Sequence, residues 1–208
     1  MKSFLFALSC SALAFAAPPC SAEEPSPGAK TVQLSKVILD TESRPVAGKL
    51  KGGTLCVFPS KIEAILPKQK KSEDYERYDQ LFAEKMSALG FHVVTVSANL
   101  FADDSDKNKA DLLIGAVVHP DTLNVCSSVN GEKGDVTLSI DWQIYDRATH
   151  TVVATLTTSG HGIQEKFSRV GLTGMWNRAF TEALNGLVEQ GALQKYTGPV
   201  APPSANGS

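Results

Sequence analysis

Residues 134–160 read GDVTLSIDWQIYDRATHTVVATLTTSG, and this stretch decides the fold. Apolar and polar residues alternate from Val136 to Ile144, and they alternate again from Val152 to Leu156. A period of two places alternate side chains on opposite faces of a β-strand. The polar, turn-forming residues 146–150 separate the two runs. The stretch therefore predicts a β-hairpin with one apolar face, which other elements of the chain must cover.

Two other segments have the period of an amphipathic helix. In the first, Ser72 is a candidate N-cap, Gly90 is a candidate stop, and the shared apolar face consists of Tyr75, Tyr78, Phe82, Met86 and Leu89. The second runs from about Met175 to Gln190 and ends at Gly191, with an apolar face of Trp176, Phe180, Ala183, Leu184, Leu187 and Val188. We expect Gly186 to let this second helix lie close to the sheet.

Further strands are expected on both sides of the first helix. Before it, residues 31–40 are weakly strand-like, and Thr54–Phe58 is a short apolar strand that Pro59 should end. After it, Phe91–Val96 begins a strand directly behind Gly90. The order strand, helix, glycine, strand implies a parallel pair with a right-handed crossover.

The segment Leu112–Val118 is apolar at every position. Such a run predicts a central strand buried on both faces, with Gly115 at a close approach of backbone or helix. We expect residues 119–121 to bend or end this strand, residues 122–125 to continue it after a kink, and residues 127–134 to form the next hairpin loop.

Taken together, these elements predict a single α/β (α+β) domain over residues 31–196. It has a mixed sheet of about five strands and two main helices, in the order β-α-β-β-β-β-α. A loop with Arg169 and Gly171 joins the hairpin to the last helix. The lead at 23–30 and the tail at 197–208 lack the apolar residues that would offset ordering, so we expect both to be flexible.

The first residues indicate export. Lys2 precedes a nearly continuous apolar run from Phe4 to Ala17, which predicts a signal peptide over 1–22 with cleavage after Ala22. A membrane-spanning helix is disfavoured because the run is short and prolines follow it. A lipid anchor is a further alternative, although Cys10 falls inside the apolar run and Cys20 follows two prolines. We therefore expect a soluble protein in the periplasm or outside the cell.

Two cysteines remain after the predicted cleavage, Cys56 and Cys126. In an oxidising compartment they are candidates for one disulfide, and the alternative is a pair of buried thiols. The predicted strand placement argues mildly against the bridge. If residue 56 lies beside the start of the strand at 112, Cys126 is about a dozen residues further along, at about 3.3 Å per residue.

Charge and motif searches give no catalytic or metal site. The formal net charge is −2, and no basic stripe is present, which disfavours nucleic acid and anionic membrane surfaces as partners. The histidines at 92, 119, 150 and 161 have no metal-ligand spacing. Asp141 and Asp146 should face opposite sides of the hairpin and form no carboxylate pair.

The segment 104–115 deserves a test as a calcium loop. Asp104, Asp106 and Asn108 match its first, third and fifth ligand positions. Lys109 stands where a glycine is needed, and Gly115 stands where a bidentate glutamate is needed. We therefore predict no tight calcium site, and we predict no cofactor.

Three segments together resemble a module of bacterial envelope accessory proteins. They are ADLLIGAVV at 110–118, IDWQIYDRATHTVV at 140–153 and AFTEALNGLVEQ at 179–190. The pattern is similar to the amino-terminal domain of the Tol system's propeller protein, to the curli secretion subunit and to lipoprotein activators of penicillin-binding proteins. The resemblance implies a binding or scaffolding module without catalytic residues.

The leading hypothesis is an exported, non-enzymatic accessory or assembly factor that binds another envelope protein at a sheet edge or groove. The candidate surface residues are His119, Asp121, Arg147, His161 and Glu165. One alternative is a small-molecule module with a pocket near residues 59–61, 97–99 and 119–121. A second alternative is a secreted hydrolase, for which no residues can be named.

Overall fold

The computed structural model describes residues 30–61, 73–95 and 110–197. The predicted signal peptide, the lead at 23–29, Ser72, Ser97–Asn99, the loop residues 104–108 and the tail from 198 lie outside them, and so do Cys10 and Cys20. The elements are β1 (Val32–Leu39), β2 (Ala47–Gly52), β3 (Phe58–Ser60), α1 (Glu73–Ala88), β4 (Leu112–Ser128), β5 (Gly131–Asp146), β6 (Thr151–Ser168), α2 (Gly171–Glu189) and α3 (Gln194–Thr197).

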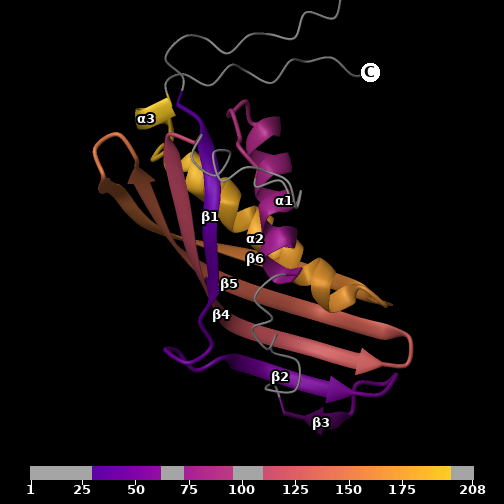
Figure 1. The fold of residues 1–208 in the computed structure, drawn as a ribbon. Helices are drawn as coiled ribbons and strands as arrows, with labels where there is room; N and C mark the ends of the chain where they lie inside the picture. Colours follow the sequence, from indigo (N-terminus) through magenta and orange to yellow (C-terminus); the bar gives the residue numbers. More distant parts are fainter. Residues whose placement is uncertain (1–29, 62–72, 96–109, 198–208) are drawn as a thin grey trace, which may run out of the picture.

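The elements form one α/β domain around a mixed six-stranded sheet, which confirms the predicted fold class. The strand order is β3-β2-β4-β5-β6, and β1 pairs with the first half of β4 while β2 pairs with its second half, both in parallel. Figure 1 shows β2 and β3 at one end of the long strands and α3 near the other. The central position predicted for the strand at 112–118 is confirmed.

The predicted hairpin is present as β5 and β6, and it is longer than expected. The apolar residues at even positions from Val136 to Ile144 are all buried, as their alternation predicts. β6 continues past Gly160 to Ser168. Its inward positions there are Gly160 and Gly162, which have no apolar side chain to mark the strand.

A layer of two helices covers one face of the sheet. α2 packs on β5 and β6, and α1 packs on β1 and against α2. The Phe180 ring lies 4.6 Å from the Tyr78 ring and 5.8 Å from the Trp142 ring, centroid to centroid, so it joins both helices to the hairpin. The Trp142 indole N–H donates to Thr158 Oγ1 (2.7 Å), and that hydroxyl donates to the Ala183 carbonyl (2.8 Å).

Both helices end at the predicted glycines, which have positive φ: 85° at Gly90 and 69° at Gly191. α2 begins at Gly171, one turn before the predicted start, because Leu172 and Met175 extend its apolar face toward the amino terminus. Gly186 lies close to the sheet as expected, since a Cβ there would be 3.3 Å from Thr158 Cβ. The expectation for Gly115 is wrong, because a Cβ there would meet nothing within 4 Å.

The amino-terminal strand predictions need the largest corrections. Residues 54–56 form an exposed turn and no strand, and β2 lies before them in a segment rich in glycine and lysine. Pro59 does not end a strand but sits within β3, a short edge strand where a missing N–H is tolerated. Of the strand expected at 91–96, the described residues give a single parallel bridge, Val32 to Val93.

β4 runs through the segment where a bend or end was expected. A register shift between Pro120 and Thr122 marks a bulge, and the strand continues to Ser128, so the loop predicted at 127–134 shrinks to a turn at Val129 and Asn130. The prediction of burial on both faces is wrong. Alternate residues such as Leu113 and Val117 are only partly buried, because the helices cover one face alone.

Candidate functional surface

The face of the sheet opposite the helices, here called the open face, is polar. On β5 it carries Asp135, Thr137, Ser139, Asp141 and Gln143, which are partly buried or exposed. Directly paired residues of neighbouring strands share a face, so His119 of β4 and Thr157 and His161 of β6 join this set. The open face therefore carries polar and titratable side chains that could contact a ligand or a partner.

A buried histidine stands at the centre of this face. His119 Nε2 lies 3.0 Å from Asp141 Oδ2, and His119 Nδ1 lies 3.6 Å from Asp40 Oδ2, beyond hydrogen-bond range. Arg44 Nη2 lies 3.7 Å from the same Asp141 oxygen, and the Thr157 hydroxyl donates to the other one. The network ties the β1–β2 connection to β4, β5 and β6.

The two carboxylates of this network have lowered pKa values. Hydrogen bonds from the Ser43 hydroxyl and then from the backbone N–H groups of Ser43 and Glu42 lower the pKa of Asp40 to about 2. The Thr157 hydroxyl is the main cause that lowers the pKa of Asp141, followed by His119 and Arg44. Both groups are therefore carboxylates at neutral pH.

Among the described residues, no serine hydroxyl hydrogen-bonds to the His119 ring. Ser139 is directly opposite His119, yet its hydroxyl donates to Asp121. Both ring nitrogens of His119 are turned toward carboxylates instead. A serine nucleophile would need a hydrogen bond to a free imidazole nitrogen. Asp146 faces the other side of β5, where it pairs with Lys30, so it forms no carboxylate pair with Asp141.

A groove of about 420 Å³ crosses the open face near the β2 end, here called the open-face groove. Its rim and wall include Lys49, Lys51, Lys133, Asp135, Ile163 and Glu165. Asp135 accepts a hydrogen bond from Asn124 (3.1 Å) and lies 3.9 Å from His161 Nε2. The lysines of β2, Ile163 and Glu165 are exposed, so the groove offers both charges and an apolar wall to a partner.

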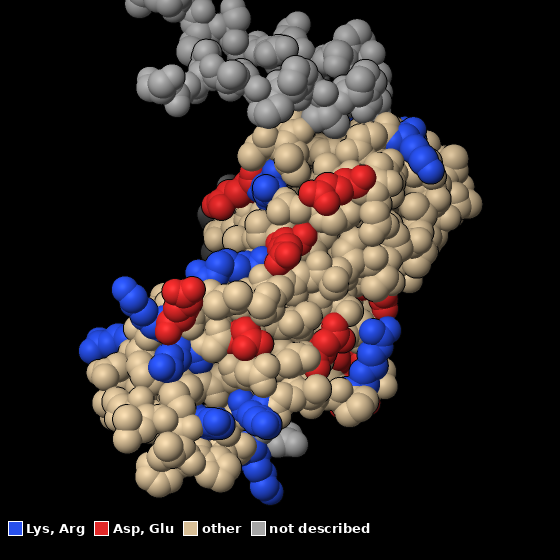
Figure 2. Space-filling model, turned by 180° about the vertical axis from the view of Figure 1, so that it is seen from behind, with Lys and Arg blue, Asp and Glu red and all other residues tan. Residues whose placement is uncertain are grey.

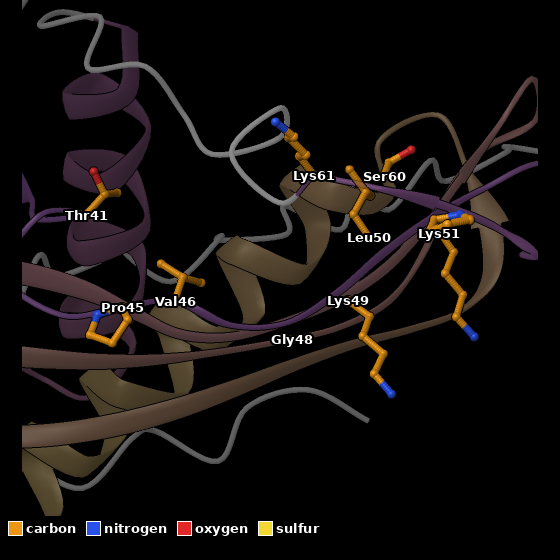
Figure 3. Close-up of a pocket in the computed structure, with 10 residues that line it drawn as sticks. Thr41, Pro45, Val46, Gly48, Lys49, Leu50, Lys51, Ser60 and Lys61 are labelled. Carbon is orange, nitrogen blue, oxygen red and sulfur yellow. The ribbon is translucent and has the colours of Figure 1, made fainter.

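A second pocket, of about 600 Å³, lies along the outer edge of β2. Pro45 and Val46 of the preceding connection and Pro59, Ser60 and Lys61 help to line it. Figure 3 shows Lys49 and Lys51 extending to one side of β2, whereas Ser60 and Lys61 extend to the other. The predicted pocket residues 59–61 therefore do line a pocket, but residues 119–121 belong to the separate network around His119.

The structure joins Cys56 to Cys126 in a disulfide, with Cα atoms 5.5 Å apart. The bridge was disfavoured on the expectation that residue 56 lies beside the start of β4. β2 instead pairs with the far end of β4, where Gly53 N–H donates to the Ser127 carbonyl. The turn that holds Cys56 therefore reaches Cys126 directly.

The disulfide fixes an apolar protrusion at this end of the sheet. Leu55, Val57 and Phe58 are exposed on and beside the turn, and Val129 is exposed in the adjacent β4–β5 turn. We call these four residues the apolar tip. Figure 2, which shows the molecule from behind, has Lys and Arg side chains gathered over the end where β2 and β3 lie.

The predicted surface residues do not form one patch. Arg147 lies in the β5–β6 turn, whereas Glu165 lies near the opposite end of the hairpin, between the paired residues Gln164 and Ser168. His119 is buried, and Asp121 accepts a hydrogen bond from Ser139 in the same part of the open face. His161 lies in β6. The glycines on either side of it allow α2 to approach, since Cβ atoms there would be 1.9 Å from the Ala179 and Met175 carbonyl oxygens.

Both the long edge of β6 and the short edge at β3 are protected. Tyr196 Oη donates to the Val153 carbonyl (2.9 Å), Gln190 Nε2 donates to the Thr157 carbonyl (3.4 Å), and His161 N–H donates to Glu182 (2.7 Å). These contacts occupy outward backbone groups that a further strand would need. β3 contains Pro59, which cannot donate. The open-face groove is therefore a better candidate for a partner than a sheet edge.

Sequence reasoning missed the lysines of this groove. Lys49 and Lys51 are far from Lys133 in the chain, and strand pairing places Lys51 and Lys133 on either side of Cys126. The lysines of β2 alternate with Gly48 and Leu50, a period-two signal within a segment too short and glycine-rich to stand out.

Comparison with known proteins gives similarities of structure only. No protein-family model and no curated protein match the chain. It is similar to a variant of the PelC dodecamer from Paraburkholderia phytofirmans, with 15% identity and a TM-score of 0.38 over 78% of this chain and 90% of that one. It is also similar to protein CT253 from Chlamydia trachomatis, with 11% identity and a TM-score of 0.42 over 80% and 99% of the two chains.

The lipoprotein GNA1162 from Neisseria meningitidis is similar at 13% identity, with a TM-score of 0.28 over 76% of this chain and 98% of that one. These similarities are to the structures of bacterial proteins that include a lipoprotein, and they assign the chain to no family. The resemblance to the Tol, curli and penicillin-binding-protein accessory modules stays a prediction. In the described ranges, no helix has the length and hydropathy to cross a membrane.

Proposed function

We propose that this protein is an exported, non-enzymatic accessory factor that binds another protein of the bacterial envelope through the open-face groove. The observation that carries the proposal is the groove itself, where exposed lysines, Glu165 and the apolar wall at Ile163 meet on the sheet face opposite the described helices. An interface needs an apolar centre with a charged rim, and this groove supplies both.

Two further observations support the proposal. The Cys56–Cys126 disulfide fits an oxidising compartment, as expected after export. His119 Nε2 and the Thr157 hydroxyl both contact the Asp141 carboxylate, and this network holds β4, β5 and β6 together beside the groove. A charged rim of this kind sets specificity and association rate more than affinity.

Site-specific crosslinking tests the proposal. A photoreactive phenylalanine analogue replaces Ile163 in the groove, and the same analogue replaces Val152, an exposed apolar residue of the same strand at its other end. We expect one recurrent envelope protein to be captured at position 163 and not at 152. Mass spectrometry of crosslinked cell envelopes identifies it.

Charge reversal supplies the second arm. Lys49→Glu changes the groove, and Lys36→Glu is the matched control, because both are exposed strand lysines that pair in parallel with β4. We expect Lys49→Glu to reduce the capture at position 163 several-fold and to slow association, whereas Lys36→Glu leaves capture unchanged. Equal capture at both crosslinker positions, or equal effects of both reversals, would overturn the proposal.

The pocket beside β2 makes a small-molecule module the second candidate. Its volume lies within the range of ligand sites, and the Ser60 hydroxyl and Lys61 ammonium accompany apolar Pro45 and Val46. A library of small anionic ligands screened by thermal shift tests it, with Ser60→Val as the variant that should abolish a specific shift. A hit that survives Ser60→Val would place the ligand elsewhere.

A further inference from the structure

Among the described residues, the apolar tip is the largest group of exposed apolar side chains outside the groove. The exposed fractions are 82% for Leu55, 60% for Val57, 67% for Phe58 and 93% for Val129. The tip comes from two turns that strand pairing sets side by side, since Gly52 pairs with Ser127. The tip is convex, so a partner would have to surround it and could not insert a side chain into it.

The backbone holds these side chains away from the core. Cys56 has a φ of 54°, its N–H donates to the Gly53 carbonyl (3.0 Å), and its sulfur is bonded to Cys126 of β4. The turn is thereby tied to the sheet on both sides of Leu55, which cannot fold back against the helices. A pre-formed protrusion of this kind loses little conformational freedom when it docks.

Basic side chains stand behind the tip at the same end of the sheet. Lys51 and Lys133 flank Cys126, and Lys166 and Arg169 lie where the end of β6 pairs with Glu132. Lys133 Nζ lies 4.6 Å from the centre of the Phe167 ring, which positions its charge. Glu132 and Glu165 are the acidic residues of these strand ends, and Figure 2 shows the basic side chains dominating this end of the molecule.

We infer that the apolar tip docks on a membrane surface that carries anionic headgroups. Leu55, Val57 and Phe58 enter the boundary between headgroups and acyl chains, and the lysines and Arg169 behind them contact the lipid phosphates. Long basic side chains can reach the headgroups while their stems stay against apolar surface. A protruding tip suits a fluid layer, which shapes itself around it, better than it suits a protein that must offer a matching cavity.

This arrangement is invisible in the sequence, where no basic stripe occurs. The cations come from β2, β5 and the end of β6, and only the sheet brings them to one end. The expectation that anionic membrane surfaces are poor partners therefore rested on sequence adjacency. The inference shares Lys51 and Lys133 with the open-face groove. It is still tested apart from the proposed function, because the tip at Phe58 and the groove wall at Ile163 can be varied separately.

Tryptophan fluorescence tests the inference. The native Trp142 and Trp176 are both buried and give a constant background, so Phe58→Trp reports on the tip and Val152→Trp reports on an exposed apolar site at the other end of the hairpin. The protein is used as its host processes it, and the chain is otherwise identical in the two variants. The probes are vesicles of phosphatidylethanolamine with and without phosphatidylglycerol.

We expect a blue shift of emission at position 58 with vesicles that contain phosphatidylglycerol, weaker in high salt, and none at position 152. In the Phe58→Trp chain, Lys166→Glu and Arg169→Glu should each weaken vesicle binding about five-fold at low salt, and the control Lys195→Glu should not. No shift at position 58, or a shift that needs no anionic lipid, would overturn the inference. A shift at 58 caused only by an added protein would also overturn it.

Discussion

The two faces of strand β5 differ sharply, although they belong to the same residues 131–146. Every even position from Val136 to Ile144 is completely buried under the helices. The odd positions are polar, and among them Asp135, Ser139 and Asp141 contact side chains of β4 or β6. The covered face stabilises the fold through burial of apolar area, whereas the open face holds polar side chains that hydrogen-bond across strands.

The two faces of β5 should also differ in how much they contribute to the free energy of unfolding. Apolar side chains in the covered face have no alternative environment, so their loss leaves a cavity. Polar contacts on the open face exchange protein partners for water and contribute about 1 kcal/mol each. Substitutions on the two faces of one strand should therefore differ several-fold in their effect on the free energy of unfolding.

The largest expected effect is that of Trp142→Ala. Trp142 is completely buried, packs against Phe180 and donates to Thr158, so its removal should lower the free energy of unfolding by about 3–5 kcal/mol. The neighbouring Gln143→Ala, on the exposed side of the same strand, should change it by about 0.5 kcal/mol or less. Urea denaturation followed by far-UV circular dichroism measures both. Equal losses would show that the open face is also part of the core.

The disulfide is the next largest expected contribution. It closes a loop with a sequence separation of 70 residues, and replacing both Cys56 and Cys126 with serine should lower the free energy of unfolding by about 2–4 kcal/mol. Hydrogen exchange would sharpen the comparison, because amides of β2 should lose protection while those of β5 keep theirs. Uniform loss of protection across the sheet would contradict a local role.

Two glycines give a smaller effect of opposite sign on the two faces. Gly160→Ala would place a Cβ 1.9 Å from the Ala179 carbonyl oxygen, so α2 must move, at a cost of about 1–3 kcal/mol. Gly115→Ala meets nothing within 4 Å and restricts the unfolded chain, so it should stabilise the protein by about 0.4–1 kcal/mol. Thermal unfolding of both variants measures the pair. A destabilising Gly115→Ala would show that something covers the open face there.

The covered face could be predicted from the sequence because buried positions are apolar and recur with the period of a strand or a helix. The alternation around Trp142 and the helical spacing of Phe180 with Leu184 each point to one layer, and together they give the fold class. The spacing of apolar residues did not predict β2 or the end of β6. In those strands the inward or edge positions are glycines, and close backbone approach replaces apolar side chains.

The candidate surface could not be predicted, because it is made by strand pairing across long sequence separations. Lys51 and Lys133 meet beside Cys126 only once β2 takes the second half of β4 rather than the first. His119 and Asp121 were named as candidate surface residues at an expected bend, whereas they lie within β4. Their partners Asp40, Asp141 and Ser139 come from other strands and from a connection without any sequence signal.

The smallest expected effect lies in the acid response of the open face. Hydrogen bonds from Ser43 and Glu42 lower the pKa of Asp40 from 3.8 to about 2, and the Thr157 hydroxyl is the main cause that lowers the pKa of Asp141. A carboxyl group with a lowered pKa in the folded state stabilises the fold above its unfolded pKa of 3.8. That stabilisation is lost as the pH falls from 3.8 to the folded value. Stability should therefore decrease between about pH 4 and pH 2.

Ser43→Ala isolates the cause, because it removes the hydroxyl that contributes most to this shift and leaves the carboxylate in place. In an NMR titration of side-chain carboxyl carbons, Asp40 should titrate near pH 2 in the native chain and move toward 3.8 in the variant. The decline in stability with acid should become shallower in step, since less of it then depends on Asp40. Trp142→Ala should lower stability at every pH and leave this slope unchanged, because a core cavity binds no protons. If Asp40 titrates at its ordinary pKa in the native chain, the hydrogen bonds from Ser43 and Glu42 do not form in solution. Residues 40–44 would then not belong to the open-face network.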